Sequence, residues 1–363
     1  MLDGHEVSRK GIIMQSACKL FCRVHSVHRA LIAFTVLTAA ALQPAAAQSF
    51  VIRDLGTLPG NTSQASGINE RGQAVGFSNV ANGDQHVTLY EDGKVIDLGT
   101  LPGGTNATAD AINARGQVIG WSAVGGNEQA SLNEHAFLFE HGEMTDLGTL
   151  PNGNTSVANG INDRGQVVGW SLNVLTDTQA VLFEKGRVID LGTLPGGYFS
   201  AAYAINDRGQ VVGWSTSATS GNDHAFLYDH GEMTDLGTLP GGNSSAAFAL
   251  NNRGQVVGQA AVANGYEHAF LYEHGVMTDL GTLPGGTLSM AFGINDRGQV
   301  VGQSTDASGN FRAFLYEHGV MTDLGMLPGG NSSTATAINN RGEIAGYSGT
   351  PYTPWHAAVW MRK

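Results

Sequence analysis

Short apolar runs separated by turn residues follow one another along residues 50–360, and no stretch carries a long 3.6-residue helical period. The segment from Ser200 to Thr238 shows the order. It contains "SAAYAIN", made mostly of small residues, then "QVVGWS", "HAFLYDHG" and "EMTDLG". Glycines at the intervening turns, Gly209 and Gly231, are free to take positive φ. The pattern predicts four short β-strands per segment and an all-β chain.

This four-strand pattern recurs seven times. "DLGTLPG" or a close variant begins at Asp54, Asp97, Asp146, Asp190, Asp235, Asp279 and Asp323, with steps of 43, 49, 44, 45, 44 and 44 residues. The phrase "N-x-R-G" and an apolar run of "HAF" type keep the same period. Four strands in about 44 residues are typical of one blade of a β-propeller.

The two ends of the repeat region are complementary fragments. The chain stops after the seventh "HAF" run, "HAAVWMRK", whereas "FVIRDLG" at residues 50–56 has no earlier strands of its own repeat. A linear array would need capping repeats at its ends, and a ring would not. We therefore predict a seven-bladed β-propeller of four-stranded antiparallel blades, closed by the N-terminal strand completing the last blade. In that strand Val51, Ile52 and Leu55 are expected to be buried.

Residues 1–47 have the features of a secretory signal peptide. Five basic residues precede or flank an apolar run from Ala30 to Leu42, which is too short to span a bilayer. "PAAAQ" then supplies a cleavage site after Ala47, and Met14 is an alternative start. The predicted organisation is a leader, 1–47, followed by one propeller domain, 48–363. The expected location is extracellular or periplasmic, and the sequence does not decide between these two.

The charge and the cysteine content limit the crosslinks and the kinds of partner that the mature chain can have. Both cysteines lie in the leader, so disulfides do not hold the mature chain together. The leader contains five of the 19 basic and two of the 31 acidic residues, which leaves 14 and 29 and a net charge of −15. Such a surface repels nucleic acid and anionic lipid. No later segment is long and apolar enough to span a membrane.

The repeat phrases "HAFLYEHGEMTDLGTLPGG" and "AINDRGQVVGWS" closely resemble those of the HAF extracellular repeat family, and the resemblance covers residues 50 to 360. It implies an exported bacterial β-propeller. Because members have no assigned activity as a class, it supplies no catalytic residues to carry over and supports fold and export but not chemistry. The chain departs from the pattern at residues 87–88, at residues 179–181 and at Arg312.

Residues that carry chemistry recur once per repeat, which favours structural roles. Histidines of one repeat, such as His224 and His230, lie about 20 Å apart on an extended strand and cannot share a metal ion. Each repeat also has an Arg in its first turn and an Asp in its fourth strand, for which we expect one structural hydrogen-bonded pair or turn clamp per blade. No catalytic residue, metal site or cofactor is predicted, and no hydrolase, zinc or nucleotide motif occurs.

The loops between second and third strands differ in every copy, and variable loops on a rigid scaffold are where binding is usually found. The candidate ligand-binding residues on that face are Tyr198, Phe199, Tyr266, Phe311, Tyr352 and Trp355. Tryptophans at the end of the second strand, Trp121, Trp170 and Trp214, are expected to wedge between blades as core.

Two functions from different classes follow. The first is a secreted, non-enzymatic binding module whose ligand is a glycan or a protein. The second is a polysaccharide lyase or glycoside hydrolase with its site at the mouth of the axial channel. An enzyme needs unlike carboxylates, or His with Arg, gathered in one pocket on the axis, whereas a channel lined only by Ala, Ser and Asn argues against one. A structural cell-surface component is a third possibility, and it would form oligomers.

Overall fold

Each of the seven repeats forms a four-stranded antiparallel sheet, as the sequence predicts. The computed structural model describes residues 49–125, 133–218, 221–350 and 353–363. The predicted leader, residues 1–47, and the candidate Tyr352 lie outside the described residues. Within the described ranges the regular elements are strands, and no helix there is long and apolar enough to cross a membrane.

The strands are grouped by their position in the blade. The innermost strands are β2 (Ser63–Ile68), β6 (Ala107–Ile112), β10 (Ser156–Ile161), β14 (Ser200–Ile205), β18 (Ser245–Leu250), β22 (Ser289–Ile294) and β26 (Ser332–Ile338). The second strands are β3 (Ala74–Asn79), β7 (Val118–Ala123), β11 (Val167–Leu172), β15 (Val211–Thr216), β19 (Val256–Ala261), β23 (Val300–Thr305) and β27 (Ile344–Thr350). The third strands are β4 (Gln85–Glu91), β8 (Glu134–Glu140), β12 (Thr178–Glu184), β16 (Asp223–Asp229), β20 (Glu267–Glu273), β24 (Phe311–Glu317) and β28 (Thr353–Arg362). The outer strands are β5 (Lys94–Gly99), β9 (Glu143–Gly148), β13 (Arg187–Gly192), β17 (Glu232–Asp235), β21 (Val276–Asp279), β25 (Val320–Asp323) and, for the last blade, β1 (Phe50–Gly56).

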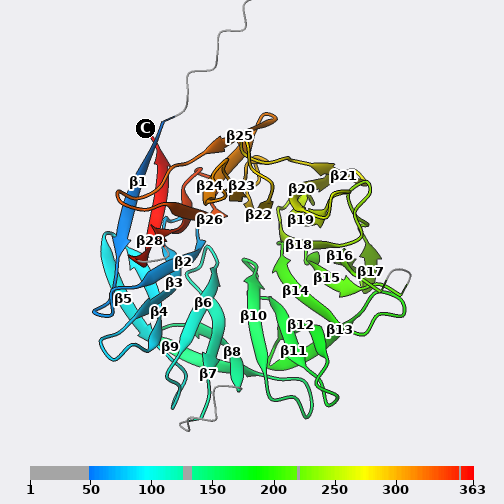
Figure 1. Cartoon of the computed structure of the whole chain (residues 1–363). Helices are drawn as coiled ribbons and strands as arrows, with labels where there is room; N and C mark the ends of the chain where they lie inside the picture. The colour runs from blue at the N-terminus through cyan, green and yellow to red at the C-terminus, as the bar shows by residue number, and fades with distance from the viewer. Residues whose placement is uncertain (1–48, 126–132, 219–220, 351–352) are drawn as a thin grey trace, which may run out of the picture. The chain divides into compact units, whose positions relative to one another are not determined.

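The seven sheets form a ring around a central axis, with the innermost strands beside the axis (Figure 1). We number the blades 1 to 7 from β2 onward. Blade 7 has the order β1-β28-β27-β26, so the N-terminal strand pairs antiparallel with the C-terminal one, from Phe50 opposite Arg362 to Gly56 opposite Ala357. The predicted closure is confirmed.

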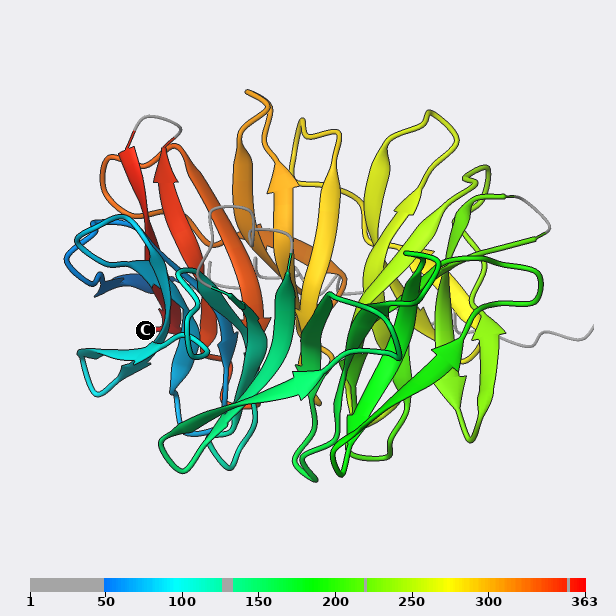
Figure 2. The same cartoon turned by 90° about the horizontal axis from the view of Figure 1, so that it is seen from below.

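Loops gather on two opposite faces of the ring (Figure 2). The loop face holds the connections between second and third strands and the "TLPGG" links between blades. The turn face holds the "N-x-R-G" turns and the hairpins between third and fourth strands. In these hairpins both central residues have positive φ, as at His230 (50°) and Gly231 (90°), which matches the right-handed twist of paired strands.

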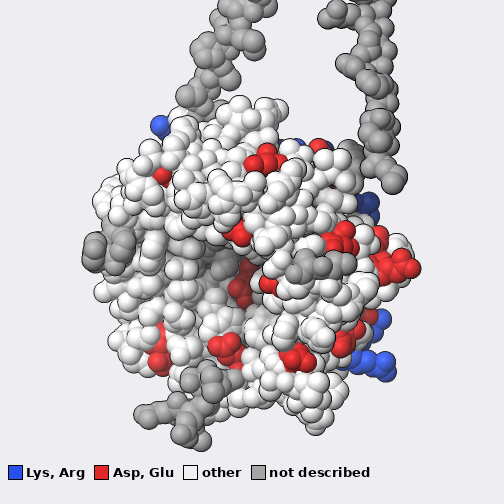
Figure 3. Space-filling model, turned by 45° about the vertical axis from the view of Figure 1, so that its right-hand side comes forward, with Lys and Arg blue, Asp and Glu red and all other residues white. Residues whose placement is uncertain are grey.

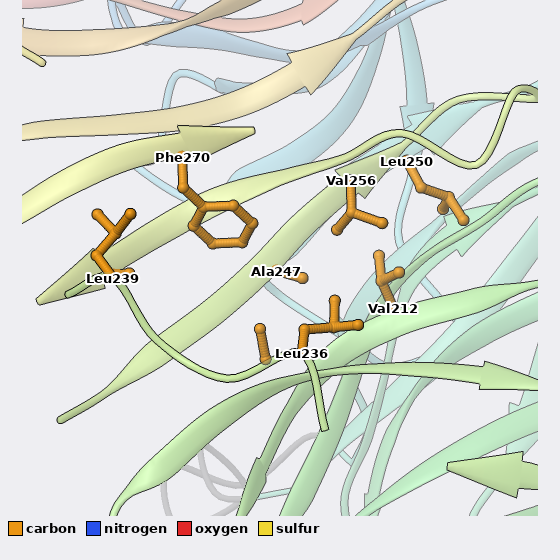
Figure 4. Close-up of a cluster of buried hydrophobic side chains, with 9 residues drawn as sticks. Val212, Leu236, Leu239, Ala247, Leu250, Val256 and Phe270 are labelled. Carbon is orange, nitrogen blue, oxygen red and sulfur yellow. The ribbon is translucent and has the colours of Figure 1, made fainter. Parts of the chain in front are cut away.

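Apolar clusters fill the interfaces between neighbouring blades. In the cluster between blades 4 and 5, Val212 and Leu236 of one blade pack against Leu250, Val256 and Phe270 of the next (Figure 4). Equivalent clusters occupy the other six interfaces. The cluster between blades 7 and 1 consists of four alanines and Tyr90, with Leu55, Ile68 and Val95 packed against it. Burial between sheets, rather than within one, therefore stabilises the ring.

One expectation for the closing strand is wrong. Val51 is 42% exposed, whereas Phe50 and Ile52 pack against the core of blade 7 and Leu55 packs against the interface with blade 1. Side chains alternate between the two faces of a strand, so Val51 points away from the face that Phe50 and Ile52 cover. The outer strand thus packs Phe50 and Ile52 against the cluster shared with blade 6 and Leu55 against the cluster shared with blade 1, and leaves Val51 exposed.

Candidate functional site

A β-bulge interrupts every innermost strand at the same place. In β18, Ala247 pairs with Gly258 and Ala249 with Val257, which leaves Phe248 unpaired between them. We name the seven bulged residues the bulge ring: Ser66, Asp110, Asn159, Tyr203, Phe248, Phe292 and Thr336. A bulge re-aims a side chain, and bulges are common next to functional sites.

The bulge ring surrounds a cavity of about 220 Å³ on the axis, lined by the bulged residue of every blade. The neighbouring positions are Ala or Gly because adjacent inner strands touch there. A Cβ added at Gly160 would lie 2.8 Å from the Cα of Ala204 in the next blade. Only small residues fit at these positions beside the axis, so the bulged side chains are the ones that vary.

The bulge ring is chemically asymmetric. Tyr203, Phe248 and Phe292 of blades 4 to 6 form a continuous aromatic arc, with ring centroids 5.3 and 5.7 Å apart. The other four members are polar or acidic. Asn159 donates a hydrogen bond to the Ala202 carbonyl at 2.7 Å, and Thr336 donates to backbone carbonyls at 2.9 and 3.1 Å. This half of the ring therefore combines polar side chains that are hydrogen-bonded to the backbone with one carboxyl group.

That carboxyl belongs to Asp110. Its Oδ2 is buried and has no hydrogen-bond partner, although the residue as a whole keeps some surface toward the cavity. Burial raises the pKa of Asp110 from 3.8 to about 7 because no nearby group stabilises its charge. A desolvated, unpartnered carboxyl facing a cavity is a candidate binding group.

A second cavity, of about 300 Å³, lies on the loop face between blades 4 and 5, and we name it the rim pocket. It shares Tyr203 and Phe248 with the bulge ring and adds Trp214, whose Nε1 donates to the Tyr203 hydroxyl at 3.3 Å. The polar residues lining it are Asp223, Ser244, Ser245, Gln259 and Glu267.

The two carboxyls of the rim pocket are perturbed in the same direction. Burial raises the pKa of Asp223, and the charge of His224 partly opposes the rise. Burial also raises the pKa of Glu267, against a hydrogen bond from the Ser244 hydroxyl at 3.5 Å and the charge of His268. The rim pocket thus combines three aromatic rings with partly desolvated acceptors.

At the turn face a continuous ring of hydrogen bonds encircles the axis. The buried Asn of each "N-x-R-G" turn donates from Nδ2 to the carbonyl of the equivalent Asn in the next blade, at 3.0–3.1 Å, and Asn339 completes the circle by donating to Asn69. Its Oδ1 accepts two backbone N–H groups of its own turn, as Asn206 does from Arg208 and Gln210. These asparagines are structural.

The residue after each of these asparagines lines the axial opening on the turn face. Four of the seven are acidic: Glu70, Asp163, Asp207 and Asp296. In six blades the backbone N–H at this position donates to the side-chain oxygen of the next blade, at 2.8–3.0 Å. Acidic atoms also appear in and beside the central hollow in the space-filling view (Figure 3). The opening has four carboxyl groups and no Lys or Arg among its lining residues, and the Arg of each turn follows directly in the chain on the same face.

The repeated Arg and Asp residues do not pair with each other. In six of the seven blades the fourth-strand Asp pairs with the first residue of the "HAF" run, at 2.7–2.9 Å, as in His224–Asp235 and in Arg312–Asp323 where Arg replaces His. In blade 3 that residue is Gln179, whose Nε2 donates to the Tyr198 carbonyl instead. Its other oxygen accepts the N–H of the glycine two residues later. The Arg is at the turn face, at the opposite end of the blade. The clamp that we expected exists, with His rather than Arg as the partner.

The six predicted ligand-binding residues are spread over several blades. Tyr198 is 74% exposed and Phe199 40%, both beside blade 4, and Tyr266 in blade 5 is 45% exposed. Phe311 in blade 6 and Trp355 in blade 7 are half-buried, and Trp355 stacks edge-on against Tyr347 at 5.3 Å. The rim pocket and the bulge ring cavity are lined by none of these five. They stay a prediction, as does Tyr352.

The tryptophans at the end of the second strand are half-buried instead of forming core, since this position faces the rim of the blade interface.

The bulge ring was missed by the sequence analysis, although a signal existed. Every repeat reads A-x-[AG]-[IL]-N, and x is the one position that changes chemical class. In the part of the chain that the structure describes, no group of three or more His, Cys, Asp or Glu is arranged to hold a metal ion.

The fold and these cavities define the class: a seven-bladed β-propeller with an asymmetric axial cavity. A family model described as "Protein of unknown function (DUF3466)" matches residues 195–280, which hold blades 4 and 5. No curated protein sequence matches the chain.

Solved structures with similar folds include a puromycin-hydrolyzing peptidase from Mycobacterium tuberculosis (13% identity, TM-score 0.56, 83% of this chain and 51% of that one). They also include the β-propeller domain of the Trilobed protease from Pyrococcus furiosus (10% identity, TM-score 0.52, 83% of this chain and 97% of that one). That domain is described as having an open velcro topology. This chain differs there, because β1 pairs with β28. It spans about half of the length of the peptidase. At these identities the similarity shows the fold alone.

Proposed function

We propose that this chain is an exported, non-enzymatic glycan-binding propeller built of HAF-type repeats, with its site in the rim pocket. The observation that carries the proposal is the set of residues in that pocket: Tyr203, Trp214 and Phe248 beside Gln259 and two partly buried carboxyls. Sugars present apolar C–H faces and hydroxyl groups together, so aromatic rings and hydrogen-bond acceptors on one wall suit them.

The arrangement of repeated and unrepeated residues supports binding over catalysis. The axial asparagines are hydrogen-bonded in every blade, and a His–Asp pair forms in five of the seven, so the side chains not committed to repeated contacts are those that vary. The variable residues concentrate on the loop face and along the axis. The repeat resemblance and the leader-like segment before residue 48 support export.

The test is a glycan array probed with the labelled protein, followed by titrations monitored by tryptophan fluorescence. We expect Trp214→Ala to weaken binding at least tenfold. Trp121→Ala is the matched control, because Trp121 holds the equivalent position in blade 2 and lies outside the rim pocket. An empty array together with a specific protein captured by pull-down would move the ligand to the protein class and refute the glycan proposal.

A glycoside hydrolase is the second candidate, and one observation favours it. Asp223 and Glu267 are two carboxyls in one pocket beside the axis, and burial raises the pKa of each, as the general acid of a glycoside hydrolase requires. If glycans that bind are also cleaved, Glu267→Gln should abolish cleavage and keep binding. Intact glycans after prolonged incubation would exclude this activity.

A further inference from the structure

The cavity inside the bulge ring has a feature that the glycan proposal does not use. Its lining contains Asp110 and no Lys, Arg or His. The remaining lining is the aromatic arc, small polar side chains and the apolar residues at the ends of the inner strands. Buried charges in proteins are normally paired, so this carboxyl lacks the partner that its position calls for.

The aromatic arc stands across the axis from Asp110. Asp110 belongs to blade 2, and in a closed ring of seven the point opposite blade 2 falls between blades 5 and 6. Phe248 and Phe292 are the bulged residues of those two blades, and Tyr203 extends the arc into blade 4. A ligand on the axis therefore has a carboxyl on one side and aromatic rings on the other.

We propose that the bulge ring cavity binds a small alkylammonium head group, with Asp110 as its counter-ion and Tyr203, Phe248 and Phe292 as cation–π partners. Aromatic rings attract cations through their quadrupole, most strongly when the cation is desolvated. This site is independent of the glycan proposal in its ligand and in Asp110, which lies outside the rim pocket.

Size and chemistry exclude other occupants. The volume of about 220 Å³ lies below the 300–1,000 Å³ or so of pockets for drug-sized ligands, so a head group fits and a large molecule does not. Hard metal ions take six or more oxygen ligands, and a ring with three aromatic members supplies too few. An anion is excluded by Asp110 and by the acidic opening on the turn face.

The acidic opening adds a second, separate contribution. Glu70, Asp163, Asp207 and Asp296 lie around the same axis, and the six Ile residues that end the inner strands other than β18 line both cavities. A channel mouth of one sign focuses the field and concentrates ions of the opposite sign. The carboxyl groups that line this opening therefore favour a cation over an anion on the axis itself.

Calorimetric titration with choline tests the proposal, with 3,3-dimethyl-1-butanol as a probe of the same shape and no charge. We expect choline to bind at pH 8 and the neutral alcohol to bind at least tenfold more weakly. Asp110→Asn should weaken choline binding at least tenfold. Glu143→Gln, which removes an exposed charge from the outer strand of the same blade, should leave it unchanged.

Choline affinity should also depend on pH. The ionised fraction of Asp110 rises about tenfold between pH 6 and 8, so the Kd should fall by a similar factor. Tyr203 is the only other titratable residue in the cavity lining. The acidic residues of the turn-face opening line the neighbouring cavity on the axis, and Asp223 and Glu267 line the rim pocket, which shares Tyr203 and Phe248 with this cavity. In Asp110→Asn the pH dependence should vanish.

Phe248→Leu keeps an apolar side chain and removes one aromatic ring. It should weaken choline binding and leave the weak binding of the neutral alcohol unchanged. The proposal is overturned if choline does not bind, if the two probes bind equally, or if Asp110→Asn binds choline as the parent does. Each of these outcomes leaves the glycan array result unaffected, so the two proposals fail separately.

Discussion

Deleting residues 48–56 removes the strand that closes the ring, and its cost can be worked out from the contacts of β1. Three half-buried side chains are lost, Phe50, Ile52 and Leu55. Full burial of such a side chain stabilises by about 1.5–3 kcal/mol, so half-burial contributes about 1 kcal/mol each. Six register pairs with β28 are lost as well, and at the lower end of about 0.5 kcal/mol per hydrogen bond they add about 3 kcal/mol.

The total of about 6 kcal/mol compares with a stability of about 5–15 kcal/mol for a typical protein. The deletion also leaves β28 as a bare edge that carries the fully buried Trp360. The interface between blades 7 and 1 is formed by alanines and Tyr90 and offers little to compensate. We expect a large fall in thermal midpoint, aggregation, or an open ring.

The assay compares thermal melts and size-exclusion profiles of the parent and truncated proteins. A synthetic peptide of residues 48–57, added in trans, should raise the midpoint of the truncated form. Ile52→Ala should lower the midpoint of the parent more than Val51→Ala, because Val51 is 42% exposed. A monomeric truncated protein with a midpoint near that of the parent would refute the idea that β1 holds the ring closed.

Three further predictions follow from the axis and the blades. Asn206→Ala removes a buried side chain with four hydrogen bonds, so it should lower the unfolding free energy by about 2–4 kcal/mol in urea titrations. The same loss in the exposed control Glu143→Gln would contradict a specific structural role of Asn206. Burial raises the pKa of Asp110 above its unfolded value, so the stability that this group contributes is full below pH 4 and is lost as the pH rises through about 7. Above pH 7 Asp110→Asn should therefore be more stable than the parent, by about 2–4 kcal/mol, with little difference at pH 4, and equal stability at both would show that the carboxyl is solvated. Gly213→Ala places a Cβ against the carbonyl of Ala201 and should destabilise the protein strongly, whereas Gly237→Ala, where a Cβ meets nothing but φ is +75°, should cost less, as circular dichroism melts will show.

The repeat period and the cut of the final copy were enough to predict the architecture. Strands repeat because "QVVGWS" and "HAFLY" segments are β-branched or aromatic and are bounded by glycine turns, and these local preferences agree with the final fold in every blade. Complementary termini predicted closure because a propeller hides its edges by pairing them. The leader and its cleavage site remain predictions.

Pairing partners inside the blade were predicted less well. The sequence shows an Arg in the first turn and an Asp in the fourth strand of every repeat and a His at the start of the third strand in five, and it does not show which of these side chains pair. The fourth strand carries its Asp to the loop face, where the third strand begins with His, while the first turn keeps the Arg at the turn face. The Asp pairs with His and not with Arg because the directions of the strands place Asp and His at the same end of the blade.

The sequence by itself determined the number of blades, the strands of each and the way in which the ring closes, because these depend on local pattern and on repetition. The tertiary structure alone decided the candidate site. Asp110, Phe248 and Phe292 are 44 to 182 residues apart, and each is a single variable position within a repeated phrase. Seven bulges turn these positions toward one axis, and the close approach of the inner strands removes water from Asp110. The raised pKa and the aromatic arc arise from that convergence, which depends on neighbours supplied by other blades.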